Sequence, residues 1–263
     1  MLLKDKVVII TGVGPGMGRH LATLAAEEGA KVAAAARSAA FINDVVAEIK
    51  KNGGEAIAVP TDVSDMAACQ NLVDQTVKAF GRVDCLINSA YSHEAMIPLD
   101  EGMEIDQYIR SYNVTFLGAV RMAKAVIPVM RKNNGGKGKG AIVNVSSQAT
   151  QQVVWGEGDY AAAKAALNQN TKQLARELGR YNIRVNACLM GWLGGPAVDG
   201  FVKSAAAQQG VAEDVIVKGI TKNIALGIIP PDRECAKAAL MMASDYASMC
   251  SGAQLNVNGG EYM

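Results

Sequence analysis

Seven short apolar segments, separated by longer amphipathic ones, constrain the fold of this chain most. The apolar segments cover residues 6–11, 31–36, 55–62, 83–90, 140–147, 183–189 and 253–258. Each is rich in Val, Ile and Ala without strict apolar–polar alternation, which is typical of strands buried on both faces of a parallel sheet. The intervening segments have helical spacing, at 17–29, 38–52, 64–80, 105–132, 158–180 and 232–243. This alternation predicts an α/β fold, a doubly wound (Rossmann-like) parallel sheet of about seven strands with helices on both faces.

A single domain is expected over residues 1–263, because the length suits one large domain and no linker interrupts the pattern. Half of the residues are hydrophobic, enough for a large core. Residues 192–231 are the longest stretch without a strong strand and have glycines at both ends. We interpret them as a substrate flap over the ligand crevice, with a plain helical excursion on the surface as the alternative.

Charge and cysteine content argue against several function classes. The chain has 26 basic and 25 acidic residues, so neither nucleic acid nor a membrane surface is expected as a partner. The N-terminal apolar run is too short for a signal peptide or a membrane span. Five scattered cysteines without a C-x-x-C motif indicate a reducing, cytoplasmic location. With two histidines in the chain, we expect no metal site.

The glycine-rich sequence TGVGPGMG, residues 11–18, follows the first predicted strand and opens a helix. Gly12, Gly16 and Gly18 lack a Cβ atom, so the backbone can turn sharply and approach a pyrophosphate closely. The helix N-terminus behind them offers free N–H groups and the positive end of the helix dipole. The loop therefore predicts a dinucleotide cofactor, with a tight turn that holds no ligand as the alternative.

A second group of polar residues follows the fifth predicted strand. Ser147 ends that strand, and Tyr160 and Lys164 are four positions apart on the next predicted helix, so they share a face. A free phenol has a pKa near 10, too high for efficient acid–base catalysis at neutral pH. We expect the charge of Lys164 to favour the phenolate and lower the pKa of Tyr160. Ser147 can hydrogen-bond a substrate oxygen, although each residue alone also has a purely structural interpretation.

The spacing G-x-x-x-G-x-G after Thr11, followed by Ser147, Tyr160 and Lys164, resembles the short-chain dehydrogenase/reductase family over essentially the whole chain. The resemblance implies an oxidoreductase with a nicotinamide cofactor. It also implies that Tyr160 is the general acid/base and that Lys164 holds the nicotinamide ribose. Asn113 would be the fourth catalytic residue and would hold a water that relays protons. Family members are commonly tetramers, so we expect a homo-oligomer, a homotetramer or a dimer.

The resemblance also implies the residues that contact the cofactor. Asn88 and Ala90 match the family's N-N-A-G motif, whereas Ser89 and Tyr91 depart from it. Asp62 stands where the family contacts adenine. The expected set is Gly12, Gly14, Gly16, Met17, Gly18, Arg37, Ser38, Asp62, Val63, Asn88, Ser89, Ala90, Tyr160, Lys164, Gly191 and Leu193.

The end of the second predicted strand indicates which nucleotide is preferred. An acidic residue there would accept hydrogen bonds from the ribose 2′-hydroxyl and repel a 2′-phosphate. This chain has Ala36 instead, followed by Arg37, a permanently charged forked donor, and by Ser38. We predict that NADP(H) is preferred, with NAD(H) as the alternative.

The expected substrate pocket is aromatic and aliphatic with few charges. Its candidate residues are Tyr91, His93, Gln148, Val154, Trp155, Met190, Trp192 and Phe201. Such walls predict a bulky, neutral, apolar ketone or secondary alcohol, steroid-like, terpenoid or aromatic. One alternative is a β-ketoacyl thioester reductase, for which we would expect clustered basic residues, whereas Lys203, Lys218 and Lys222 are spread out. The other is a non-catalytic nucleotide-binding sensor, which would not need the phenol.

Overall fold

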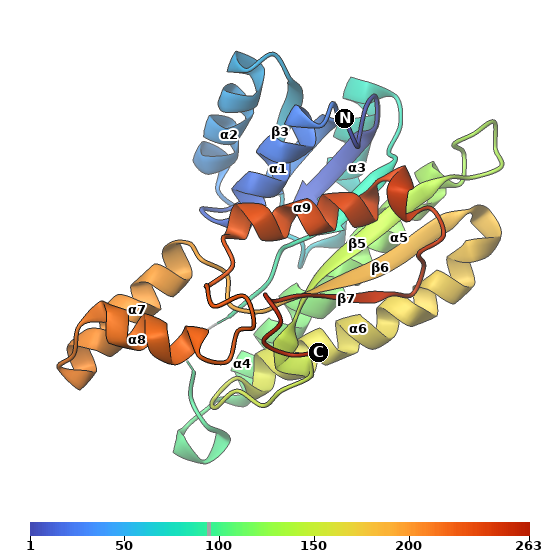
Figure 1. The fold of residues 1–263 in the computed structure, drawn as a ribbon. Helices are drawn as coiled ribbons and strands as arrows, with labels where there is room; N and C mark the ends of the chain where they lie inside the picture. Colours follow the sequence, from blue (N-terminus) through green and yellow to red (C-terminus); the bar gives the residue numbers. More distant parts are fainter. Residues whose placement is uncertain (94–95) are drawn as a thin grey trace.

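The computed structural model describes residues 1–93 and 96–263, and its centre is a seven-stranded sheet (Figure 1). The strands are β1 (Val7–Thr11), β2 (Lys31–Ala36), β3 (Glu55–Pro60), β4 (Cys85–Asn88), β5 (Gly140–Ser147), β6 (Ile183–Met190) and β7 (Gln254–Val257). Their order is β3-β2-β1-β4-β5-β6-β7, and all neighbouring pairs are parallel. Because the winding reverses between β1 and β4, a crevice for ligands is expected at their carboxyl ends.

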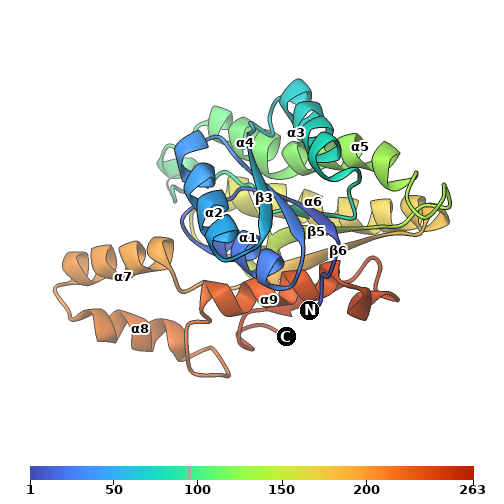
Figure 2. The same ribbon diagram turned by 90° about the horizontal axis from the view of Figure 1, so that it is seen from above.

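Helices cover both faces of this sheet (Figure 2). They are α1 (Met17–Glu27), α2 (Ala39–Lys51), α3 (Met66–Phe80), α4 (Ile105–Ser111), α5 (Gly118–Met130), α6 (Gly158–Leu178), α7 (Pro196–Gln209), α8 (Glu213–Thr221) and α9 (Asp232–Ala243). Short helical turns are η1 (Leu99–Glu101), η2 (Tyr112–Leu117), η3 (Gln148–Thr150), η4 (Gly179–Tyr181) and η5 (Asp245–Ala247). Helices α1, α2 and α9 pack on one face, and α3, α5 and α6 on the other. The predicted fold class is confirmed.

The continuous apolar character of the strands follows from burial on both faces. Every residue of β1 is buried. Val8 and Ile10 pack into the core beneath α1, α2 and α9, whereas Ile9 packs into the core on the opposite face. Successive strand residues point to opposite faces, so a strand covered on both sides needs apolar residues at every position.

The helical segment Ile105–Met130 is apolar, and a short π-helix divides it into α4 and α5. By length and composition it could cross a membrane, with a mean hydropathy of 1.2, but 44% of its most apolar window is buried inside the domain. Its ends, α4 and α5, pack on α6 and on α3 and β4. We therefore interpret it as a core helix. Between them, η2 is a π-helix, which shifts the side chains that follow it relative to a regular α-helix.

The predicted flap, residues 192–231, is a helical hairpin. Helices α7 and α8 pack on each other and stand out from the body of the domain (Figures 1 and 2). Two backbone hydrogen bonds close its base: Gly194 N–H donates to Pro230 O at 2.8 Å, and Asp232 N–H donates to Gly194 O at 3.0 Å. The hairpin is therefore joined to the sheet at a narrow neck.

Candidate active site

Ser147, Tyr160 and Lys164 come together where β5 ends and α6 begins. Tyr160 and Lys164 lie one turn apart on α6, and Lys164 Nζ is 5.5 Å from the centroid of the Tyr160 ring. The Ser147 hydroxyl lies close enough to the Tyr160 hydroxyl to lower the pKa of the phenol. Ser147 Oγ also accepts from Ala149 N–H at 3.1 Å, which fixes its position at the strand end. The structure thus brings the predicted trio together.

The protonation of this trio differs from the sequence-based expectation. Burial raises the pKa of Tyr160, and the nearby Ser147 hydroxyl offsets only part of that effect. Lys164 is 2% exposed, and its Nζ donates to Val145 O at 2.6 Å. Burial lowers the pKa of Lys164 to about 7. The expected lowering of the Tyr160 pKa by Lys164 is therefore wrong for the protein alone, because removal of both groups from water dominates. Tyr160 keeps its proton at neutral pH.

The loop after β4 forms the wall opposite α6. The Tyr91 ring lies 6.1 Å from the Tyr160 ring, and the His93 ring lies 5.1 Å from it in an edge-to-face arrangement. His93 Nε2 is 3.1 Å from Glu157 Oε1. That hydrogen bond raises the pKa of His93. Sequence reasoning missed Glu157, although its position three residues before Tyr160 was a usable signal for a shared helix face.

Asn113, the expected fourth catalytic residue, is hydrogen-bonded to Arg121. Its Oδ1 accepts from Arg121 Nη2 at 2.7 Å and its carbonyl oxygen accepts from Arg121 Nη1 at 3.1 Å. Arg121 Nη1 also reaches Val63 O at 3.5 Å, so Asn113 is turned toward the end of β3. Thr115, two residues further along η2, is buried, and its Oγ1 accepts from Ser92 N–H at 3.0 Å, between Tyr91 and His93. The π-helix shifts the register of this segment, so residue spacing alone does not predict which of its side chains face the site.

The turn between β1 and α1 fits a pyrophosphate. Gly16 precedes α1 without any side-chain cap, which leaves N–H groups of the first helical turn open to a ligand. Gly12 has a φ of +72°, and a Cβ there would lie 2.5 Å from Ala90 N. A Cβ on Gly18 would lie 2.2 Å from Gly12 O, whereas Gly14 meets nothing closer than 3.9 Å. The turn therefore packs tightly against backbone at Gly12 and Gly18, whereas the space beside Gly14 is open.

The ends of β2 and β3 carry the residues expected around the adenosine. Arg37 is exposed beyond β2, and Ser38 caps α2 by accepting from Phe41 N–H at 3.4 Å. Asp62 accepts from the hydroxyl and the N–H of Ser64 at 2.7 and 2.8 Å. These bonds, with smaller contributions from Arg37 and Arg121, lower the pKa of Asp62. The carboxylate is therefore ionised and held in place.

The end of β4 supplies further contacts. Thr11 Oγ1 accepts from Ser89 N–H at 3.3 Å and from Ala90 N–H at 3.4 Å, which joins β4 to the glycine-rich turn. Asn88 Nδ2 donates to Asn144 Oδ1 at 2.9 Å. Asn88 Oδ1 is buried and has no partner among the described residues. A cofactor donor would satisfy this oxygen, so the residues present fit a dinucleotide.

Among the expected contact residues, Met190 and Met17 are buried in the core on the α9 side of the sheet, and Val63 is buried in the core on the other side. Met190 is 3% exposed and packs on the α9 side of the sheet, so its assignment to the substrate pocket is wrong. Met17 is 8% exposed in the same core, which leaves only its backbone to meet a cofactor. Strand and helix periodicity decide both orientations, because each residue falls on the apolar face of its element.

The remaining pocket candidates differ in placement. Trp192 packs on Phe201 at the base of the flap, with ring centroids 5.4 Å apart. Trp155 is 71% exposed and Val154 is half-buried. Gln148 is buried, and its Nε2 donates to Glu261 near the C-terminus. A Cβ on Gly191 would lie 2.7 Å from Gln148 Oε1, and Leu193 packs against the core.

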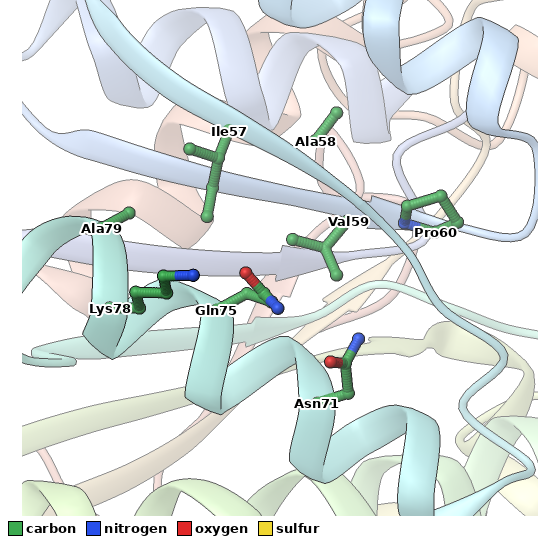
Figure 3. Close-up of a pocket in the computed structure, with 8 residues that line it drawn as sticks. All are labelled: Ile57, Ala58, Val59, Pro60, Asn71, Gln75, Lys78 and Ala79. Atoms are coloured by element: carbon green, nitrogen blue, oxygen red, sulfur yellow. The ribbon is translucent and has the colours of Figure 1, made fainter.

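Two surface grooves lie elsewhere. One of about 590 Å³ separates the edge strand β3 from α3 (Figure 3), lined by Ile57, Ala58, Val59, Pro60, Asn71, Gln75, Lys78 and Ala79. Its only ionisable side chain is Lys78, so it offers no acid–base pair. Another of about 420 Å³ is lined by residues that include Lys6 and Lys139, both of which pair with Asp245. Within residues 1–93 and 96–263, no group of three His, Cys, Asp or Glu side chains could hold a metal ion.

Comparisons with known proteins identify the family of this chain. The family model described as enoyl-(acyl carrier protein) reductase matches residues 12–261. A meso-2,3-butanediol dehydrogenase from Serratia marcescens is 32% identical, with 99% of this chain and 96% of the relative covered. A 3-oxoacyl-(acyl-carrier-protein) reductase from Thermotoga maritima is 31% identical, with 99% of each chain covered.

A solved structure extends the likeness to the fold. A 7α-hydroxysteroid dehydrogenase, in complex with NADH and 7-oxo glycochenodeoxycholic acid, superposes with a TM-score of 0.87 at 30% identity, covering 98% of this chain and 94% of that one. Together with the glycine-rich turn and the Ser147–Tyr160–Lys164 group, these matches identify the chain as a member of the short-chain dehydrogenase/reductase family of nicotinamide-dependent oxidoreductases.

Proposed function

We propose that this protein is an NADP(H)-preferring oxidoreductase that interconverts a ketone and a secondary alcohol on a bulky, neutral, apolar substrate. The observation that carries the proposal is the convergence of Ser147, Tyr160 and buried Lys164 at the strand ends beside the glycine-rich turn. Tyr160 is the proposed general acid/base. A binding module would have no use for a phenol held against a serine hydroxyl and a buried amine.

Each residue of the trio has a separate task in this proposal, and that of Lys164 is to hold the ribose of the nicotinamide. The Ser147 hydroxyl donates a hydrogen bond to the substrate carbonyl oxygen and stabilises the negative charge that develops there. Tyr160, which holds its proton at neutral pH, transfers that proton to the same oxygen. The bound nicotinamide supplies the hydride to the carbonyl carbon. In the reverse direction, the Tyr160 phenolate accepts the proton of the alcohol.

The substrate class rests on the surroundings of the trio. Tyr91, Trp192 and Phe201 provide apolar surface, and the structurally similar hydroxysteroid dehydrogenase was solved with a steroid ketone. The match to an acyl-carrier-protein reductase family and relative favours a second candidate, reduction of a β-ketoacyl thioester. The butanediol dehydrogenase relative adds vicinal diols to the compounds worth testing.

Assembly and location are part of the proposal as well. Ile105, Ile109 and Tyr112 are 66%, 59% and 42% exposed along one side of α4 and the start of η2, which supports a homo-oligomer, a tetramer or a dimer. Light scattering after size exclusion tests this. The five free cysteines, four of them buried, support a cytoplasmic protein.

One screen tests the reaction. Steroid, terpenoid and aromatic ketones, acetoacetyl thioesters and 2,3-diols are incubated with NADPH or NADH, or with the oxidised cofactors for the diols. Turnover is followed by nicotinamide absorbance. We expect reduction of bulky ketones, and we expect Tyr160→Phe to lower kcat by about 10²- to 10⁴-fold. Full activity of this variant would disprove the assigned role of Tyr160, and thioesters as the best substrates would replace the first candidate with the second.

A further inference from the structure

An ion pair of Glu157 and His93 lies against Tyr160, and neither member has a role in the reaction described above. Glu157 is the residue before α6 and its carbonyl oxygen accepts from Ala161 N–H at 2.8 Å. Its side chain makes no capping hydrogen bond to the helix. The carboxylate, 15% exposed, is instead 3.1 Å from His93 Nε2. The His93 ring in turn lies 5.1 Å from the ring of Tyr160.

The position of Glu157 has an electrostatic consequence. A carboxylate three residues before Tyr160 is a like charge for the phenolate, so it opposes loss of the phenol proton. The negative charge of Glu157 does raise the pKa of Tyr160, in addition to the effect of burial. His93 neutralises that charge only while its imidazole is protonated. The influence of Glu157 on Tyr160 therefore depends on the state of His93.

We propose that Glu157 is a positioning residue that helps to keep the proton on the Tyr160 hydroxyl while its partner His93 is neutral, so that Tyr160 enters the reaction as a proton donor. The inference rests on the proposed function, because the proton of Tyr160 matters only if Tyr160 is the acid/base. When His93 is protonated the pair is neutral, and Tyr160 gives up its proton more easily. When His93 is neutral, Glu157 holds the proton on Tyr160, which favours carbonyl reduction over alcohol oxidation.

Other ionisable groups face the same cluster. Lys164 lies 5.5 Å from the Tyr160 ring and favours its ionisation when charged. Tyr91, across the site, disfavours it. Asp159 is buried, with no partner for its Oδ2 among the described residues, and its charge adds to the raised pKa of His93. The Tyr108 hydroxyl of α4 approaches the backbone at Gly158. Of these groups, Glu157 is the carboxylate that both hydrogen-bonds His93 and raises the pKa of Tyr160.

Fluorine NMR tests the pair without any substrate. All seven tyrosines are replaced by 3,5-difluorotyrosine during expression, which brings phenol ionisation into the pH range of the folded protein and gives each residue a signal. The Tyr160→Phe variant identifies the signal of residue 160. Its titration midpoint is then compared in the otherwise unchanged protein, in Glu157→Gln and in His93→Gln.

The two variants have different expected outcomes. Glu157→Gln keeps the size and hydrogen-bonding capacity of the side chain but removes its charge. We expect it to lower the midpoint of residue 160 by about 0.5 to 2 pH units, the range for a like charge a few ångströms away at the protein surface. We expect His93→Gln to leave the midpoint unchanged, because imidazole is already neutral at the alkaline pH where the phenol ionises.

A matched control removes one acidic charge from the far end of the same helix. Glu177→Gln changes the net charge equally and should leave the midpoint where it is. The proton NMR titration of His93, one of only two histidines, checks that each variant remains folded, and in Glu157→Gln the His93 pKa should fall.

The proposal is overturned if Glu157→Gln leaves the midpoint of residue 160 unchanged. It is also overturned if Glu157→Gln and His93→Gln shift that midpoint equally, because a merely structural pair would act through loop position in both variants. Neither result depends on turnover. Failure of this inference is therefore distinguishable from failure of the proposed reaction, which the Tyr160→Phe assay measures separately.

Discussion

The cofactor turn and the flap are both rich in glycine, yet the two regions use glycine in opposite ways. At Gly12 and Gly18, a Cβ atom would collide with backbone of the same turn or of the end of β4. At Gly210, where α7 ends, φ is +64° but no atom lies within 4 Å of the missing Cβ. The turn is rigid because neighbouring backbone fills the space around it. The flap has few such neighbours, so its shape depends on two helices that pack mainly on each other.

Substitution of the two glycines gives the largest expected contrast. Gly12→Ala combines an unfavourable φ with a backbone clash, so we expect a loss of about 3 kcal/mol or more of unfolding free energy and of detectable cofactor binding. Gly210→Ala meets only the φ penalty, and we expect a loss of about 1 kcal/mol with cofactor affinity intact. Urea unfolding and nicotinamide fluorescence titration measure both. Equal losses in the two variants would contradict the comparison.

Buried and exposed lysines provide the next contrast. The pKa of Lys164 is lowered to about 7 by burial, so between pH 7 and the unfolded value of 10.5 the unfolded chain binds one more proton than the folded one. Unfolding free energy should therefore rise with pH in this window, by up to about 1.4 kcal/mol per pH unit from this group. Lys164→Met should remove that rise.

The flap lysine Lys218 is the control for this prediction. It is fully exposed, and its hydrogen bond to Asp214 raises its pKa. Lys218→Met should leave the pH dependence between pH 7 and 9 as it is in the unchanged protein. If the unfolding free energies of the unchanged protein and of Lys164→Met differ by the same amount at every pH between 7 and 9, Lys164 is charged in the folded state.

The residue that follows β2, Arg37, allows a test of the preference for NADPH over NADH. Arg37→Asp replaces the proposed 2′-phosphate donor with a group that repels it, so the ratio of kcat/KM for NADPH over NADH should fall by about tenfold to a hundredfold. Arg82→Asp, at the opposite end of the sheet next to Asp84, is a control for the charge change. An unaltered ratio in Arg37→Asp would refute the assignment of NADP(H).

The smallest stability effect is expected in the flap. Phe201 is 42% exposed and touches Trp192, so Phe201→Ala should change unfolding free energy by no more than about 1 kcal/mol. We expect KM for a bulky ketone to rise while cofactor affinity is unchanged. A large loss of stability would mean that the hairpin is as firmly packed as the cofactor turn.

The sequence by itself determined the sheet, the cofactor turn and the Ser147–Tyr160–Lys164 group. These features depend on local information: residues with period 2 or 3.6, a glycine spacing, and a strand end followed by a helix whose residues four apart share a face. The structure confirms the predicted sheet, because burial on both faces of a parallel sheet leaves little freedom in how such segments are arranged.

Only the tertiary structure decided which neighbouring side chains face the site. Asn113 bonds Arg121, Thr115 bonds Ser92, and Met190 is buried in the core. Packing of the loop after β4 on α6 brings His93 and Glu157, 64 residues apart in the chain, to Tyr160. The raised pKa of Tyr160 and the lowered pKa of Lys164 follow from burial, which depends on every element around them rather than on the four-residue spacing that joins them.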